Sequence, residues 1–144
     1  MPDTTSGMTV ARPAVCPALL YRDAKAALKQ LITAFGFTQS AYYESEDGTV
    51  LHAELIHGNG MVMLGSADRA GAFVEAMGSG GPAGIYVVVE DVDAHFARAR
   101  EHGAEILAEP ADQDYGSRDY MARDLEGNVW TFGTYAPSGP ETSI

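Results

Sequence analysis

Residues 118–135, RDYMARDLEGNVWTFGTY, decide the fold of this chain. The runs 118–123 and 128–135 are rich in aromatic and β-branched residues, which favour strands. Between them, residues 124–128 (DLEGN) bring together the Asp, Gly and Asn that turns prefer. The stretch therefore predicts two neighbouring strands joined by a turn.

The residues before this stretch extend it into a complete β-α-β-β-β unit. Residues 85–89 are apolar and β-branched, Asp91 is a suitable helix cap, and the apolar residues that follow recur at helical spacing until Gly103. Residues 104–108 read as the next strand. The predicted order from residue 84 is strand, helix and three strands.

The first half of the chain shows the same order. A strand at 15–21 precedes a helix that Asp23 caps and Gly36 ends, and strands follow at 37–43, 49–56 and 60–65. Asp23 and Asp91 are 68 positions apart (23 to 91), and so are Gly65 and Gly133 (65 to 133). A constant offset at several features indicates a duplication.

The predicted fold class is α+β, with two tandem βαβββ modules forming a curved mixed eight-stranded sheet with helices outside. The expected organisation is a single domain at 13–136, made of module one at 14–66, a linker at 67–83 with a short helix near 67–77, and module two at 84–136, between flexible tails at 1–12 and 137–144.

Composition limits the function. The chain has 144 residues and a formal net charge of −11, which disfavours nucleic acid as a partner. It shows no signal peptide and no apolar stretch long enough for a membrane span, so we expect a cytoplasmic protein that does not bind membranes. The single cysteine, Cys16, is expected to be a small core residue.

The double β-α-β-β-β unit, together with Asp91, Gly103 and the turn at 124–128, resembles the vicinal oxygen chelate superfamily over about residues 14–136. The turn is similar to the family's Asp-Pro-Asp/Glu-Gly-Asn motif, with Leu125 in the place of proline. The family contains glyoxalases, extradiol dioxygenases, epimerases, fosfomycin-resistance enzymes and metal-free bleomycin-binding proteins. The resemblance thus implies the fold more firmly than the chemistry.

In the metal-using members of this family, His, Gln or Glu ligands occupy the first and last strand of each unit. The matching positions here are Cys16 (or Pro17), Met63, Gly84 (or Ile85) and Thr131. None of these is a usual oxygen or nitrogen ligand for a catalytic metal. We therefore expect no metal and no other cofactor, and a chain closest to the metal-free bleomycin-resistance-like members.

Strand alternation nominates the ligand-binding residues. If Met63 and Thr131 face a cleft, a tight turn at 57–60 pairs Glu54 with Met63 and places His52 on the same face. The 68-residue offset adds Tyr120 and Ala122, while Trp130 and Phe132 face the helices. The candidate set is His52, Glu54, Met63, Tyr86, Tyr120, Thr131 and Tyr135.

Several readings of these residues stay open. His52 and Glu54 suit ligand recognition or acid/base chemistry, but a pair of partly exposed strand residues explains them equally well. The tyrosines suit stacking on a planar or cationic ligand, or ordinary packing. His95 and His102 are expected on the solvated face of the second helix.

The sequence favours a protein that binds a small planar or cationic molecule in a cleft without a catalytic metal, as a homodimer. The alternative is a metal-dependent lyase, isomerase or dioxygenase of the same superfamily, with donors from His52, Glu54 or a partner subunit. A third reading is a metal-free acid/base enzyme that uses Glu54 and His52 on a carbonyl substrate.

Overall fold

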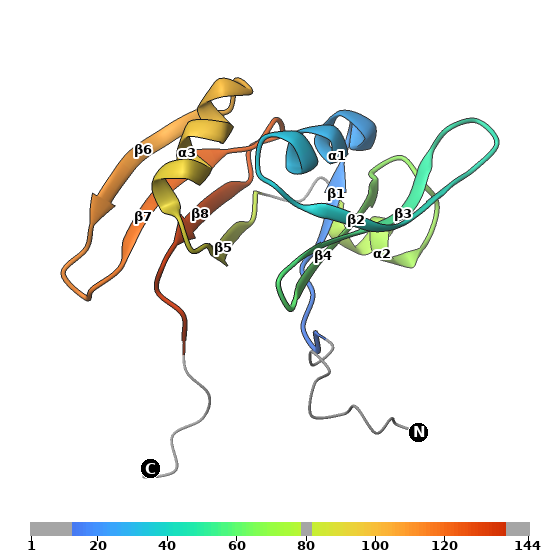
Figure 1. Cartoon of the computed structure of the whole chain (residues 1–144). Helices are drawn as coiled ribbons and strands as arrows, with labels where there is room; N and C mark the ends of the chain where they lie inside the picture. Colours follow the sequence, from blue (N-terminus) through green and yellow to red (C-terminus); the bar gives the residue numbers. More distant parts are fainter. Residues whose placement is uncertain (1–12, 79–81, 138–144) are drawn as a thin grey trace, which may run out of the picture. The chain divides into compact units, whose positions relative to one another are not determined.

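The computed structural model describes residues 13–78 and 82–137, which form two units (Figure 1). The first unit contains residues 13–28 and 36–78, and the second contains residues 29–35 and 82–137. The predicted tails lie outside the described residues except for 137, as does part of the linker (79–81).

The first unit contains a four-stranded mixed sheet. Its strands are β1 (Ala18–Tyr21), β2 (Thr38–Glu44), β3 (Val50–His57) and β4 (Gly60–Ser66), in the spatial order β1-β4-β3-β2. The strand β1 runs parallel to β4, and the other neighbours are antiparallel. Helix α1 (Ala24–Thr33) connects β1 to β2, and α2 (Ala72–Met77) follows β4 inside the predicted short helix.

The second unit repeats this topology. Its strands are β5 (Gly84–Val88), β6 (Glu105–Asp112), β7 (Arg118–Arg123) and β8 (Val129–Gly133), in the order β5-β8-β7-β6. Helix α3 (Val92–Glu101) connects β5 to β6 and packs on β6, β7 and β8 (Figure 1). The predicted fold class is confirmed: α+β, two βαβββ modules and eight strands, divided into two four-stranded mixed sheets.

The predicted helix caps are confirmed. The carboxylate of Asp23 accepts a hydrogen bond from the Ala26 amide at 3.1 Å, and that of Asp91 accepts one from Ala94 at 3.0 Å. Each bond satisfies an amide that has no partner within the first turn of its helix. Residues 23 and 91 therefore start corresponding helices in the two modules.

Alternation along the strands gives each sheet a buried and an exposed face. On the first sheet, Leu19, Ala53 and Leu64 are buried, while the residues beside them on the other face are half-exposed, apart from the buried Gly65. Trp130 and Phe132 are fully buried on the second sheet, as predicted for residues that face a helix. We call the opposite sides of the two sheets their exposed faces.

The last turn of α1 belongs to the core of the second unit. The ring of Phe35, just after α1, lies 6.1 Å from Trp130 and 5.2 Å from Phe132, centroid to centroid. Arg98 of α3 donates from Nε to the Thr33 carbonyl at 2.9 Å and from Nη2 to Ile32 at 3.2 Å. A side chain of the second module thus satisfies carbonyls at the C-terminal end of α1, which have no partner within that helix.

The turn that decides the fold is built around a buried carboxylate. Asp124 accepts hydrogen bonds from the amides of Glu126 and Asn128, at 2.9 and 3.0 Å, through Oδ1. Its Oδ2 accepts from Asn128 Nδ2 and from the Trp130 indole, both at 3.0 Å. Asp124 therefore holds the turn and the largest core side chain together.

The chain departs from prediction at Cys16. The first strand was expected from residue 15, but β1 begins at Ala18, and Cys16 precedes it as a half-buried free thiol.

In the described ranges 13–78 and 82–137, no helix is both long enough and apolar enough to cross a bilayer.

Candidate functional site

The exposed face of the second sheet carries a group of aromatic side chains. Tyr86 of β5 pairs with Thr131 of β8, and its hydroxyl donates a 2.9 Å hydrogen bond to the carbonyl of Tyr135. Tyr86, Tyr115 and Tyr135 are 39%, 63% and 48% exposed. These exposed rings offer aromatic area that can stack on a flat ligand or attract a cation.

Asp119 of β7 places a carboxylate among these rings. Its Oδ1 accepts a hydrogen bond from Gln113 Nε2 at 3.0 Å, and its Oδ2 accepts one from the Tyr115 hydroxyl at 3.1 Å. The Tyr115 ring stands perpendicular to that of Tyr135, with 6.0 Å between centroids. We call Tyr86, Tyr115, Asp119 and Tyr135 the tyrosine–aspartate face.

The donors to Asp119 keep it oriented as an acceptor. Partial desolvation raises the pKa of Tyr115, and the hydrogen bond to Asp119 raises it further. Tyr115 therefore stays protonated at neutral pH and keeps donating to the carboxylate. A half-buried carboxylate fixed between two donors can receive a cationic group without reorganising.

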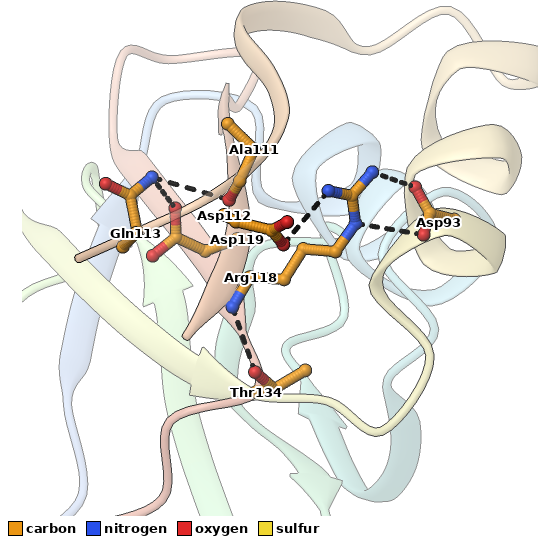
Figure 2. A network of polar contacts seen from close by, with 7 residues as sticks. All are labelled: Asp93, Ala111, Asp112, Gln113, Arg118, Asp119 and Thr134. Atoms are coloured by element: carbon orange, nitrogen blue, oxygen red, sulfur yellow. Dashed lines mark hydrogen bonds and ion pairs between the residues drawn. The ribbon is translucent and has the colours of Figure 1, made fainter. Parts of the chain in front are cut away.

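A second network, shown in Figure 2, fixes the strand end that carries Gln113. Arg118 binds both carboxylate oxygens of Asp93 in α3, at 2.9 and 3.1 Å, and donates from Nη1 to Asp112 at 3.2 Å. These hydrogen bonds lower the pKa of Asp93. Because Gln113 directly follows Asp112, the Arg118 network positions the side chain that orients Asp119.

The exposed face of the first sheet holds three of the predicted candidates together. Glu54 of β3 pairs with Met63 of β4, as the two-residue turn predicted, and His52 Nε2 lies 2.9 Å from Glu54 Oε2. The Tyr43 ring stacks on His52, with 6.3 Å between centroids and 24° between planes. His52 and Glu54 thus form a histidine–carboxylate pair that is still partly accessible to solvent.

The face predicted for Tyr120 and Ala122 is wrong. Tyr120 is 1% exposed and stacks on Phe132 on the buried face of the second sheet. Its burial raises the pKa of the phenol above the ordinary value. Both residues therefore belong to the core and line no exposed site.

The cause of this error is the length of one turn. Four residues (57–60) separate the paired Ile56 and Met61, whereas five (124–128) separate the paired Arg123 and Val129. Because of the extra residue, the position in the second module that corresponds to Glu54 is 67 residues later (54 to 121). Met121, and not Ala122, therefore pairs with Thr131. A shift of one residue moves each side chain to the opposite face of a strand.

His95 is also not on a solvated face. Its Nδ1 lies 2.6 Å from the Tyr120 hydroxyl and its Nε2 lies 2.8 Å from the Phe35 carbonyl. The carbonyl can only accept, so Nε2 carries a proton and donates to it. His102 is exposed and bonds through Nδ1 to the Arg98 carbonyl at 3.0 Å, in keeping with its predicted position.

The residues that the sequence did not nominate lie around the β6–β7 turn. Gln113, Tyr115 and Asp119 come together because β6 runs to Asp112, four residues beyond its predicted end at 108. The only available signal was the density of polar and aromatic residues at 112–119. Tyr86, Thr131 and Tyr135, by contrast, were nominated from the sequence, and the structure brings them together on the second sheet through the Tyr86–Thr131 pairing and the bond to the Tyr135 carbonyl.

Comparison with known proteins agrees with this architecture. The model of the Glyoxalase/Bleomycin resistance protein/Dioxygenase superfamily matches residues 14–132. The chain belongs to this superfamily.

Two known proteins are similar in sequence to this chain. An uncharacterized protein of Mycobacterium bovis, Mb0911c, is 32% identical over 125 residues, which cover 84% of this chain and 82% of that protein. The crystal structure of TioX from Micromonospora sp. ML1 is 33% identical and matches with a TM-score of 0.70, covering 88% of this chain and 98% of TioX.

A more distant structure shares the fold. The V278E mutant of glyoxalase I from Zea mays is 17% identical, with a TM-score of 0.68, over 88% of this chain and 46% of the maize chain. This similarity shows a shared fold. The chemistry of this chain depends on the side chains that its own two sheets carry.

The superfamily includes metal-dependent enzymes, so the donor set of this chain is informative. The first unit offers Cys16 and Met63 at the expected ligand positions, and the second offers Gly84 and Thr131. A thiol, a thioether, a position without a side chain and a hydroxyl do not fit a catalytic divalent metal. Within residues 13–78 and 82–137, no three His, Cys, Asp or Glu side chains gather into a group able to hold a metal ion.

Proposed function

We propose that this superfamily member binds a small, planar or cationic organic molecule without a catalytic metal. The observation that carries the proposal is the tyrosine–aspartate face, where Asp119 is fixed by two donors beside three partly exposed phenol rings. The ligand binds on this face of the second sheet.

The chemistry of the face suits a cation better than an anion. An organic cation is attracted to the faces of aromatic rings and to a carboxylate, and each attraction strengthens as water is displaced. The net charge of −11 gives the whole protein a negative field, which also attracts a cation. A flat ligand also gains contact area against Tyr86 and Tyr135, which are joined by the hydrogen bond from the Tyr86 hydroxyl.

Metal-independent binding follows from the residues at the four ligand positions. Met63 and Thr131 stand where a metal-using member would place oxygen or nitrogen donors. The residues that do converge on the second sheet are phenols and one carboxylate, which recognise organic groups without a metal.

The proposal includes a homodimer. Each four-stranded sheet has two edge strands, β1 and β2 in the first and β5 and β6 in the second. Short sheets with unpaired edges favour association with another copy, and most homo-oligomers are twofold symmetric. Light scattering at several concentrations should give twice the mass of 15.3 kDa.

The binding test compares matched ligands. N-methylquinolinium, which is planar and cationic, should raise the Tm and give a saturable heat in calorimetry, whereas neutral 2-quinolinone should bind at least about tenfold more weakly. Asp119→Asn should remove this preference. Asp114→Asn, an exposed acid in the same turn, is the matched control and should preserve it.

Elemental analysis tests the metal-free part. The purified protein is incubated with Mg²⁺, Mn²⁺, Fe²⁺, Ni²⁺ and Zn²⁺ and then desalted. Stoichiometric retention of one of these ions would contradict the proposal and favour the metal-dependent lyase, isomerase or dioxygenase alternative.

The His52–Glu54 pair favours a second candidate function, metal-free acid/base chemistry on a carbonyl compound. Glu54 orients the imidazole from 2.9 Å, and a histidine held in this way by a carboxylate is a typical arrangement for general acid/base catalysis. Loss of turnover in Glu54→Gln with unchanged ligand affinity would support this activity, and equal turnover in both proteins would exclude it.

A further inference from the structure

The exposed face of the first sheet carries a guanidinium group, that of Arg69, which forms no ion pair with any described residue. Arg69 follows β4, and its amide donates to the Ser66 carbonyl at 3.3 Å in a tight turn. This turn brings the side chain back over Gly65, where a Cβ would lie 2.8 Å from Arg69 Nε and 3.4 Å from Cζ. Gly65 thus leaves the space in which the guanidinium rests.

The side chain of Arg69 is held but not satisfied. Its Cζ lies 5.8 Å from the centre of the Phe73 ring, at the start of α2. Its Nε is buried and has no hydrogen-bond partner among the described residues. A buried N–H without a partner is costly, because it has given up water and gained no acceptor.

The two basic side chains of β7 are paired: Arg118 binds two aspartates, and Arg123 binds Glu105. Lys25 of α1 lies 3.2 Å from Glu44. In a chain with twenty acidic residues, a half-buried arginine without an ion pair to any described residue is an exception. An arginine of this kind is typical of a site that an anionic ligand completes.

We propose that Arg69 is the anion-binding residue of a second ligand site, on the exposed face of the first sheet, and that it takes the carboxylate of a small organic acid. The site goes beyond the proposed function: it lies on the other sheet from Asp119 and has the opposite charge preference. Arg69 contributes the charge, and Gly65 and Phe73 position it.

The geometry favours a carboxylate. The guanidinium is a rigid planar fork that matches the two oxygens of a carboxylate, and such paired hydrogen bonds are stronger than neutral ones. Leu64 pairs with Ala53, so Gly65 lies level with His52 in the register. The organic part of the acid would therefore extend over the face that carries His52 and Met63.

The test uses benzoate at constant ionic strength with ¹⁵N-labelled full-length protein. The arginine Nε–Hε resonance that disappears in Arg69→Lys belongs to Arg69, and benzoate is expected to shift it saturably. Neutral benzamide, of nearly the same shape, should leave it in place. Absence of a saturable shift, or an equal shift with benzamide, would overturn the proposal.

Variants separate charge from position. Arg69→Gln should weaken benzoate binding at least about tenfold. The matched control Arg123→Gln removes an arginine already paired with Glu105 and should leave the affinity unchanged. Gly65→Ala keeps Arg69 but displaces its guanidinium, so this variant should also bind more weakly even if Arg69→Gln proves unstable. Unchanged affinity in both Arg69→Gln and Gly65→Ala would overturn the proposal.

Two further measurements identify the class of ligand and test whether this site is independent of the cation site on the second sheet. Saturable binding of inorganic phosphate without binding of benzoate would overturn the carboxylate assignment. Asp119→Asn should abolish the preference for N-methylquinolinium and leave benzoate binding intact. Loss of benzoate binding in Asp119→Asn would contradict an independent site on the first sheet.

Discussion

The hydroxyl of Tyr86 reaches the carbonyl of Tyr135 across Gly133, at a distance of 2.9 Å. A Cβ at Gly133 would lie 2.5 Å from the Tyr86 hydroxyl oxygen and 2.8 Å from the Cβ of Asp119. The absence of a side chain at residue 133 therefore lets a phenol and a carboxylate lie side by side on the second sheet.

Gly133→Ala should disrupt the tyrosine–aspartate face. The new methyl group cannot share the space of the Tyr86 hydroxyl, so the ring must turn away and its hydrogen bond to Tyr135 must break. We expect a loss of about 1–3 kcal/mol in the free energy of unfolding and at least about tenfold weaker binding of N-methylquinolinium. Denaturant unfolding and calorimetry measure the two effects.

Gly84→Ala is the control for this substitution. Gly84 lies in β5 of the same sheet, and a Cβ there meets no atom within 4 Å. Its effect on both measurements should be small. Equal losses in the two variants would show that alanine acts through the strands in general.

Tyr120→Phe should destabilise the protein without affecting the ligand. The change removes the hydroxyl that lies 2.6 Å from Nδ1 of the half-buried His95, so this hydrogen bond is lost. We expect a loss of about 1–3 kcal/mol in the free energy of unfolding and unchanged affinity for the cation. A clear loss of affinity at full stability would restore Tyr120 to the ligand-binding face.

Asp124→Asn should be among the most damaging conservative changes in the chain. An amide puts an NH₂ group where the carboxylate now accepts from Glu126, Asn128 and Trp130, so at least one buried donor faces another donor. We expect a loss of about 2–4 kcal/mol, seen in denaturant unfolding followed by the fluorescence of the single tryptophan. Leu125→Ala, at an exposed position of the same turn, should change stability far less.

The carboxyl of Asp47 should titrate at unusually low pH. Hydrogen bonds from the Ser45 hydroxyl and the Thr49 amide lower the pKa of Asp47 from 3.8 to about 2, and the Ser45 bond has the larger effect. Because the folded value is depressed, the stabilisation is complete above 3.8 and is lost as the pH falls through about 2. NMR titration of the Asp47 side chain measures this directly.

Ser45→Ala tests the cause assigned to this shift. The variant removes the hydrogen bond with the larger effect on this pKa, so the pKa of Asp47 should rise back toward 3.8. A titration that stays near 2 in the variant would assign the shift to the backbone amide instead.

The sequence predicted the parts of the site that depend on strand alternation beside a short turn. Two residues, Gly58 and Asn59, join β3 to β4, so the register that places Glu54 opposite Met63 follows from the turn alone. The same reasoning failed for Tyr120, because an offset measured on β8 does not carry across a turn with an added residue. The capping aspartates and the βαβββ order were predictable since they depend on local chemistry.

Other parts of the site depend on tertiary structure and left little trace in the sequence. Asp119 has a role only because the β6–β7 turn brings Gln113 and Tyr115 to it. His95 follows a helical spacing that suits a solvated face, yet residues far away in the chain, Phe35 and Tyr120, supply its partners. Periodicity reports which face of an element is apolar, and a polar group buried by distant contacts escapes it.

The placement of Phe35 in the core of the second unit affects the order of events during synthesis. Phe35 leaves the ribosome about 95 residues before Trp130 (35 to 130), the ring it packs against. At roughly 5–20 residues per second, that interval is about 5–20 s. For that time the end of α1 must stay uncovered, and the C-terminal half of the chain alone does not supply the complete core of the second unit, because residues 29–35 come from the N-terminal half.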